Sequence, residues 1–191
     1  LKKKIYIFFF SLFKNCFLYH CTSDLEKNQI QKILKVKNKK KFIIIRNLIG
    51  SSEKLNNIDN NLKEKKFIYL SRIDKKKNLL GLCESINKIK KSFEVPIFID
   101  VYGYVHDKNY FNECKKYFQI LKNKNINFRY CGHIQPKDIE KTLSKYILLI
   151  HPSHNENFGH VIIESLAVGT CVLTSTLTPW ENSSSIKLVM S

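Results

Sequence analysis

The chain has 191 residues, 43% of them hydrophobic, so it can build a substantial core and is too short for more than one large or two small domains. Its net charge of +17 would suit nucleic acid, an anionic membrane or an anionic substrate. Because the basic runs are scattered and no recognition motif accompanies them, a general lysine bias explains the charge better. Six cysteines without a CxxC pair indicate reduced thiols in a cytoplasmic protein.

The chain begins at Leu1 and its single methionine is Met190, so we expect it to be a piece of a longer protein. The apolar run 5–13 has nine residues between lysines, whereas a membrane span needs about 20. No small-residue cleavage site follows, as a signal peptide would require. The run therefore predicts a buried or surface-lying helix.

Two short strands are predicted before the first long polar stretch. Residues 16–23 form a strand that runs into a helix, because Ser23 and Glu26 have the spacing of a capping box. Residues 41–50 form a continuous apolar strand. The polar stretch 51–66 is then predicted to be a linker and the internal boundary of the chain.

From Phe67 onward, apolar strands alternate regularly with amphipathic helices. Such alternation predicts an α/β domain with a Rossmann-like, doubly wound parallel sheet that helices cover on both faces. Ligands of this class bind beyond the carboxyl ends of the strands. The predicted strands are 67–73, 95–103, 126–132, 147–153 and 171–176, and the predicted helices are 78–93, 107–122, 135–146 and 158–169.

Two glutamates flank the predicted start of the helix 158–169. Glu156 lies in the preceding loop, and Glu164 lies about two turns into the helix among apolar neighbours. A helix start offers unpaired N–H groups and a positive dipole end, which suit a phosphate or a sugar hydroxyl. Glu164 either needs a donor from protein or ligand, or lies on a solvated stripe with His160.

Two cations and two glycines follow other strands at the same edge. Arg72 and Lys77 could clamp a diphosphate, since arginine binds an oxyanion bidentately and lysine acts as a point charge. An exposed basic turn is the alternative. Gly103 and Gly132 each follow a strand directly, which fits either a ligand close to the backbone or turn chemistry alone.

The stretches "YLSRIDKKKNL", "YCGHIQPKDI", "LIHPSHNENFGHVIIESLAVGTCVL" and "TPW" resemble the carboxyl-terminal half of a retaining glycosyltransferase of family 4, with the GT-B fold. Glu156 and Glu164 match that family's E-x7-E motif. The sequences of these stretches are most similar to those of transferases that build bacterial surface polysaccharides. The resemblance implies a donor-binding domain at residues 16–191, incomplete at its carboxyl end, after the tail of an acceptor domain at 1–15. The fold would therefore be truncated at both ends.

The resemblance also implies roles for individual residues. Arg72 and Lys77 would hold and stabilise the leaving diphosphate. Glu156 would bind the donor sugar's hydroxyls, and together these three are the predicted catalytic residues. Glu164 would reach the nucleotide ribose. The remaining predicted donor-binding residues are Gly103, Gly132, His133, Ile134, Phe158, Gly159 and His160.

The implied reaction moves a sugar from a nucleotide diphosphate sugar, expected to be UDP-linked, to a glycan or lipid-linked glycan, with retention of configuration. No cofactor and no metal are expected, because Arg and Lys take the metal's role, and no nucleic-acid partner is expected. The expected location is the cytoplasm, at the inner face of the cell membrane, with peripheral contact to its surface. Two alternatives stay open: a truncated, non-catalytic fragment that binds nucleotide weakly or not at all, and a basic nucleic-acid or membrane-surface binding module.

Overall fold

The chain forms two compact units, Leu1–Ile49 and Gly50–Ser191. Nearly all of the predicted linker 51–66 lies outside the residues that the structure describes, and the assignment of 1–15 and 16–191 to two functional domains stays a prediction. The computed structural model describes residues 7–8, 11–12, 14, 16–36, 38, 41–45, 66–90, 92–180 and 187–188.

The first unit contains a β-α-β arrangement. Strand β1 (Tyr19–Cys21) pairs in parallel with β2 (Phe42–Ile44), and helix α2 (Asp24–Leu34) connects them. One face of the strand pair packs on α2 around the buried Tyr19, Cys21 and Phe42. In the apolar run 5–13, the described residues 7–8 and 11–12 are helical, as predicted.

The predicted helix start at Ser23 is confirmed. The Ser23 hydroxyl accepts a hydrogen bond from the Glu26 backbone N–H at 3.2 Å. The Glu26 carboxylate reaches one residue further back than a capping box requires, and accepts from the N–H (2.7 Å) and hydroxyl (2.8 Å) of Thr22. The first contact satisfies a donor that the first helical turn leaves unpaired, and the others join the helix to the residue before its cap.

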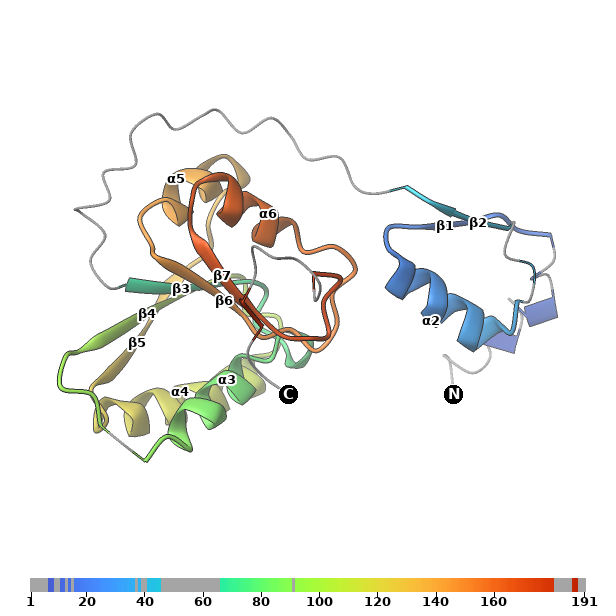
Figure 1. Ribbon diagram of the computed structural model, residues 1–191. Helices are drawn as coiled ribbons and strands as arrows, with labels where there is room; N and C mark the ends of the chain where they lie inside the picture. Colours follow the sequence, from blue (N-terminus) through green and yellow to red (C-terminus); the bar gives the residue numbers. More distant parts are fainter. Residues whose placement is uncertain are drawn as a thin grey trace. The chain divides into compact units, whose positions relative to one another are not determined.

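The second unit holds a parallel sheet with the order β5-β4-β3-β6-β7-β8 (Figure 1). The chain builds outward from β3 through β4 to β5, then returns to the other side of β3 and continues. This order is that of a doubly wound sheet, so the predicted class is confirmed. The strands are β3 (Lys66–Leu70), β4 (Ile97–Tyr102), β5 (Ile126–Gly132), β6 (Leu148–His151), β7 (Cys171–Thr174) and β8 (Lys187–Leu188).

Helices cover both faces of this sheet. Helices α3 (Leu79–Asn87) and α4 (Lys108–Lys122) lie on one face, and α5 (Ile139–Leu143) and α6 (His160–Ala167) on the other (Figure 1). Two apolar clusters fill the two layers. One joins the buried residues of α3 and α4 to inward side chains of β3, β4 and β5, and the other joins those of α5 and α6 to β3, β6 and β7.

The strand order reverses between β3 and β6, which are direct neighbours. Doubly wound sheets bind ligands in the crevice above such a reversal, at the carboxyl ends of the strands. The loops that follow β3 and β6 are therefore where this class of fold places a ligand.

Two predicted helices are shorter than the sequence pattern indicated. Helix α3 ends at Asn87, and the Lys124 ammonium donates to the carbonyls of Asn87 and Ile89 at that end. The segment predicted as helix 135–146 begins as a 3-10 turn, η4 (Pro136–Asp138), and becomes α-helical only at Ile139. Proline is well accommodated in this first turn, because its missing N–H would have had no partner within the helix.

Backbone hydrogen bonds around Gly103 connect the ends of β3, β4 and β5. Gly103 has a φ of +144°, its N–H donates to the Gly132 carbonyl at 2.8 Å, and the neighbouring Ser71 N–H donates to the Tyr102 carbonyl at 3.1 Å. A Cβ added at Gly103 would lie 1.8 Å from the Ser71 carbonyl oxygen. The glycine is thus required for close packing of backbones, and its predicted place at the donor stays a prediction.

We expect Gly103→Ala to lower the free energy of unfolding by about 3 kcal/mol or more, because the hydrogen-bonded backbones cannot move apart. Gly132→Ala is the matched control. Its φ of +84° is also left-handed, but a Cβ there meets open space. The control should lose only about 1–2 kcal/mol. Denaturant unfolding measures both, and equal losses would contradict the packing role of Gly103.

None of the helices in the part of the chain that the structure describes is long and apolar enough to cross a membrane.

Candidate functional site

The loop after β3 is shaped by a short 3-10 turn, η3 (Lys75–Lys77). Asp74 caps this turn, and its carboxylate accepts from the Lys77 backbone N–H at 3.0 Å. Asn78 then adopts a left-handed conformation (φ +57°) and α3 begins. This sequence of turns fixes the Lys77 backbone while its side chain extends from the loop.

Tyr69 supports the same loop from the core. Its side chain is fully buried, and its hydroxyl lies within hydrogen-bond distance of two carbonyls, Lys77 at 3.2 Å and Arg72 at 3.4 Å. The backbones of both predicted cations are therefore held by one tyrosine. The sequence alone did not identify Tyr69, because a tyrosine within an apolar strand has the pattern of an ordinary core residue.

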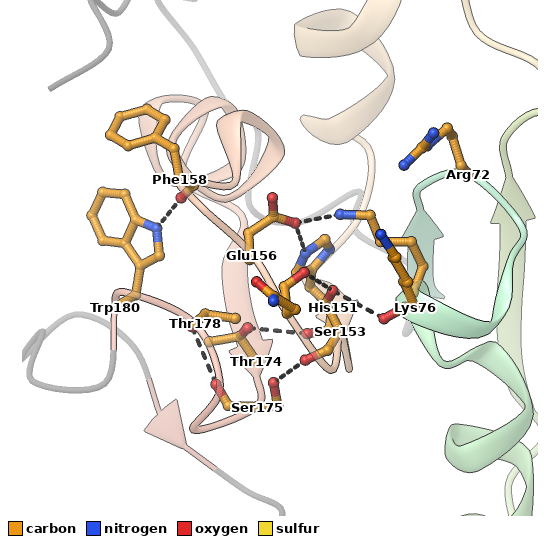
Figure 2. Close-up of polar contacts among 12 residues, drawn as sticks. Arg72, Lys76, His151, Ser153, Glu156, Phe158, Thr174, Ser175, Thr178 and Trp180 are labelled. Carbon is orange, nitrogen blue, oxygen red and sulfur yellow. Dashed lines mark hydrogen bonds and ion pairs between the residues drawn. The ribbon is translucent and has the colours of Figure 1, made fainter. Parts of the chain in front are cut away.

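The loop after β6 is tied to the β3 loop by hydrogen bonds. The Ser153 hydroxyl and the His154 N–H reach the Lys76 carbonyl at 3.2 and 2.9 Å. The Ser153 carbonyl in turn accepts from the Ser175 hydroxyl at 2.5 Å, at the end of β7 (Figure 2). The carboxyl ends of β3, β6 and β7 thus form one hydrogen-bonded rim.

Two predicted site residues meet across this rim. The Lys77 ammonium lies 2.5 Å from the Glu156 carboxylate, although the residues are 79 positions apart in sequence. The His151 Nε2 lies 3.0 Å from the same carboxylate oxygen (Figure 2). His151 ends β6 and is 2% exposed. Sequence reasoning placed His151 at a strand end but gave it no role.

The contacts set the charge of the Glu156 carboxylate. Burial alone would raise its pKa, but the hydrogen bonds from His151 and Lys77 and the charge of Lys77 outweigh burial and lower the pKa to about 2. Glu156 is therefore ionised throughout the physiological pH range.

This pKa predicts an acid-dependent loss of stability. Because the folded pKa is about 2 and the ordinary value is 4.5, the contribution of Glu156 is complete above about pH 4.5 and is lost as the pH falls toward 2. We expect a difference on the order of 3 kcal/mol across that window. Urea unfolding should give the wild type a higher free energy of unfolding than Glu156→Gln, and this difference should shrink between pH 5 and pH 3. A difference that does not depend on pH would contradict the ion pair.

Arg72 is not part of this contact. Its guanidinium is 60% exposed and lies 3.7 Å from the Asp74 carboxylate. Figure 2 shows it above the β3 loop, with no contact drawn to Glu156. Its closest charged neighbour is thus the residue that caps η3, and its predicted place on the diphosphate stays a prediction.

Helix α6 begins beside Glu156. Gly159 is its N-cap, with a φ of +78° and no side-chain cap. A Cβ at Gly159 would lie 2.9 Å from Ile162 and 3.2 Å from Glu156, so the glycine lets the loop pass close to the helix. Phe158 is buried, and its carbonyl accepts from the Trp180 indole N–H at 2.5 Å (Figure 2). Its ring contacts those of Trp180 and His160.

Glu164 lies one turn after His160 on α6 and is half-buried. Burial raises the pKa of its carboxyl and nearby Glu140 adds to this, while His160 opposes it. None of the described residues donates a hydrogen bond that lowers this pKa. The structure does not bring Glu164 into contact with Glu156, and its predicted role at a ribose stays a prediction.

The end of β5 carries the remaining predicted residues. Gly132 faces open space where its Cβ would be, His133 is exposed, and Ile134 is buried. Gly132 thus leaves room for a ligand near the backbone, whereas Gly103 is required for packing.

A cavity of about 380 Å³ lies beside the rim rather than on it. It runs between α3 and the ends of β6 and β7, and it includes His154 and Ser175 but neither Lys77 nor Glu156. In the part of the chain that the structure describes, no group of three or more His, Cys, Asp or Glu side chains could hold a metal ion. The expectation of a reaction without metal stays a prediction.

The chain is similar to several solved glycosyltransferase structures. A glycosyltransferase from Rickettsia africae ESF-5 matches with a TM-score of 0.70 and 20% identity, over 92% of this chain and 50% of that one. HepE from Anabaena, in complex with UDP and glucose, matches with 0.64 and 17%, over 86% and 46%. WaaG, a glycosyltransferase involved in lipopolysaccharide biosynthesis, matches with 0.64 and 17%, over 89% and 48%.

These proteins have the GT-B fold, so the predicted fold class is confirmed, and the chain spans about half of their length. No curated protein has a matching sequence. Residues 51–181 match the family described as glycosyl transferases group 1, which includes the β3 loop, the β6 loop and α6. This match covers more than half of the chain, and the chain therefore belongs to the glycosyl transferases group 1 family.

Proposed function

We propose that the protein transfers a sugar from a nucleotide diphosphate sugar, UDP-linked, to a glycan or lipid-linked glycan. The observation that carries this proposal is the Lys77–Glu156–His151 cluster at the point where the strand order of a group 1 sheet reverses. The complex of HepE with UDP and glucose supports the choice of donor. A lipid-linked acceptor would place the reaction at the inner face of the cell membrane.

The site residues suit the charges of this reaction. Transfer breaks the bond between the anomeric carbon and the diphosphate oxygen, and a new bond forms to an acceptor oxygen. Negative charge builds on the leaving diphosphate, and positive charge builds on the sugar ring. The ammonium of Lys77 and the uncapped start of α6 would stabilise the diphosphate. Arg72 would join them by turning away from Asp74.

Glu156 would bind the sugar. Its Oε2 is used by Lys77 and His151, while its Oε1 accepts no hydrogen bond from the described residues. An ionised carboxylate with one free oxygen can accept a sugar hydroxyl and favour the positive charge of the transition state. We further propose that configuration is retained and that Arg and Lys do the work of a metal. These two points rest on the resemblance to family 4.

A thermal-shift panel tests the donor assignment. UDP and UDP-glucose should raise the melting temperature by an amount that grows with the logarithm of their concentration above Kd, whereas ADP and GDP should raise it less. Lys77→Met should reduce the shift at every concentration. Absence of a shift with all nucleotide diphosphates and their sugars would contradict a donor site in this chain.

A further inference from the structure

One oxygen of Glu156 serves two donors. Its Oε2 accepts from the Lys77 ammonium at 2.5 Å and lies 3.0 Å from His151 Nε2. Because the carboxylate is ionised, the proton of the second hydrogen bond must be on His151 Nε2. Lys77 and His151 are the charged or titratable groups among the described residues that act on Glu156.

The two donors are not held equally. His151 is the last residue of β6 and is 2% exposed. It pairs in register with Thr174 on β7, and its carbonyl accepts a hydrogen bond from the Thr174 hydroxyl at 3.0 Å. The backbone of Lys77 is likewise fixed, by Asp74 and Tyr69, but its side chain is 14% exposed, against 2% for His151. Its ammonium ends a flexible four-carbon chain. Lys77 can therefore turn to another anion, whereas the His151 ring stays in place.

The proposed function gives Lys77 a second anion to bind. The diphosphate of a donor would draw the ammonium away from Glu156. With no other partner, the largely buried carboxylate would lose its compensation and would take up a proton or move. The sugar would then lose its acceptor at the moment when the diphosphate is bound.

We propose that His151 is the positioning residue of Glu156, and that it holds the carboxylate in place while Lys77 exchanges it for the diphosphate of the donor. The inference rests on the proposed function for the identity of the second anion. Lys77 then binds the diphosphate, while Glu156, held by His151, binds the sugar. His151 itself does not touch the donor.

Two substitutions separate this role from simple packing. His151→Leu fills the buried space but donates nothing, and His151→Gln retains an N–H at a similar reach. At pH 7, we expect the leucine variant to bind UDP about 10-fold more weakly than the wild type, because Glu156 would be left unpaired. At pH 5 a proton can take the place of the lost donor, so the difference should shrink to about 3-fold or less. The glutamine variant should resemble the wild type at both values.

Calorimetric titration with UDP measures these affinities. A leucine variant that binds as the wild type does would overturn the proposal. The proposal would also be overturned if both variants lost UDP affinity by the same factor at pH 7 and at pH 5. A packing defect would give that result, because it depends neither on a proton nor on a hydrogen-bond donor.

A second measurement needs no nucleotide. Carbon-13 NMR of the side-chain carboxyl should show the Glu156 titration midpoint at least about one pH unit higher in His151→Leu than in the wild type, since one of two donors is gone. An unchanged midpoint would overturn the proposal, whatever UDP does. If the wild type binds no UDP while the midpoint does move, the proposed function fails but the link between His151 and Glu156 stands.

Nitrogen-15 NMR of the wild type covers the case in which the leucine variant does not fold. The His151 ring should carry its proton on Nε2 both without and with UDP, whereas the Lys77 ammonium signal should change when UDP binds. A His151 ring that loses this hydrogen bond when UDP binds would overturn the proposal.

Discussion

Replacing Glu156 with glutamine is expected to lower the rate of sugar transfer by about 100-fold, the typical effect of removing one preorganised electrostatic group. Glutamine has the same shape and can still contact Lys77 and His151, so the loops after β3 and β6 should stay joined. It lacks the negative charge that would favour a positively charged sugar ring. Initial rates of transfer from UDP-glucose to a glycan extract measure the effect, in a polypeptide that carries both halves of the fold.

Glu164→Gln is the matched control for this substitution. It makes the same chemical change eight residues later, at a carboxylate that contacts neither Lys77 nor His151. We expect a higher KM for the donor with little change in kcat, because the predicted role of Glu164 is to bind the ribose. Equal losses of kcat in the two variants would contradict the distinction between a residue that acts on the sugar and one that binds the nucleotide.

Lys77→Met is expected to weaken UDP binding by about 10- to 100-fold, because a partly buried ammonium bound to a diphosphate makes a charge-assisted hydrogen bond. Methionine keeps much of the aliphatic length, and the backbone of η3 stays capped by Asp74. The loss should be smaller at high salt, since part of the attraction is screened. Titration calorimetry with UDP gives both values.

Lys75→Met controls for general positive charge. Lys75 lies on the same 3-10 turn, is exposed, and has no contact with Glu156. Its removal lowers the net charge by the same amount but should change UDP affinity less than about 2-fold. If the two variants weaken binding equally, the effect comes from the overall charge of the chain, and the specific role of Lys77 is wrong.

Local patterns in the sequence predicted most of the elements correctly. The strand predicted at 126–132 has the bounds of β5, and the capped helix at 107–122 differs from α4 by one residue. Helix α4 is long and strongly periodic, and its periodicity comes from burial against the sheet. The helix predicted at 78–93 ends at Asn87, where the ammonium of Lys124, 37 residues further along the chain, donates to the Asn87 carbonyl. No local pattern contains that contact.

The candidate site shows the same division. The sequence by itself determined that Glu156 and Lys77 lie at strand ends, because apolar runs and turns decide where strands stop. Only the tertiary structure decided that their side chains meet, that Arg72 turns to Asp74, and that His151 lies on the same oxygen as Lys77. The physical reason is that strand positions follow from short-range burial patterns, whereas ion pairs depend on which strands become neighbours and on the rotamers that their loops allow. Gly103 and Gly132 look alike in sequence for this reason, and only the backbone that lies opposite each distinguishes the one required for packing from the one that faces open space.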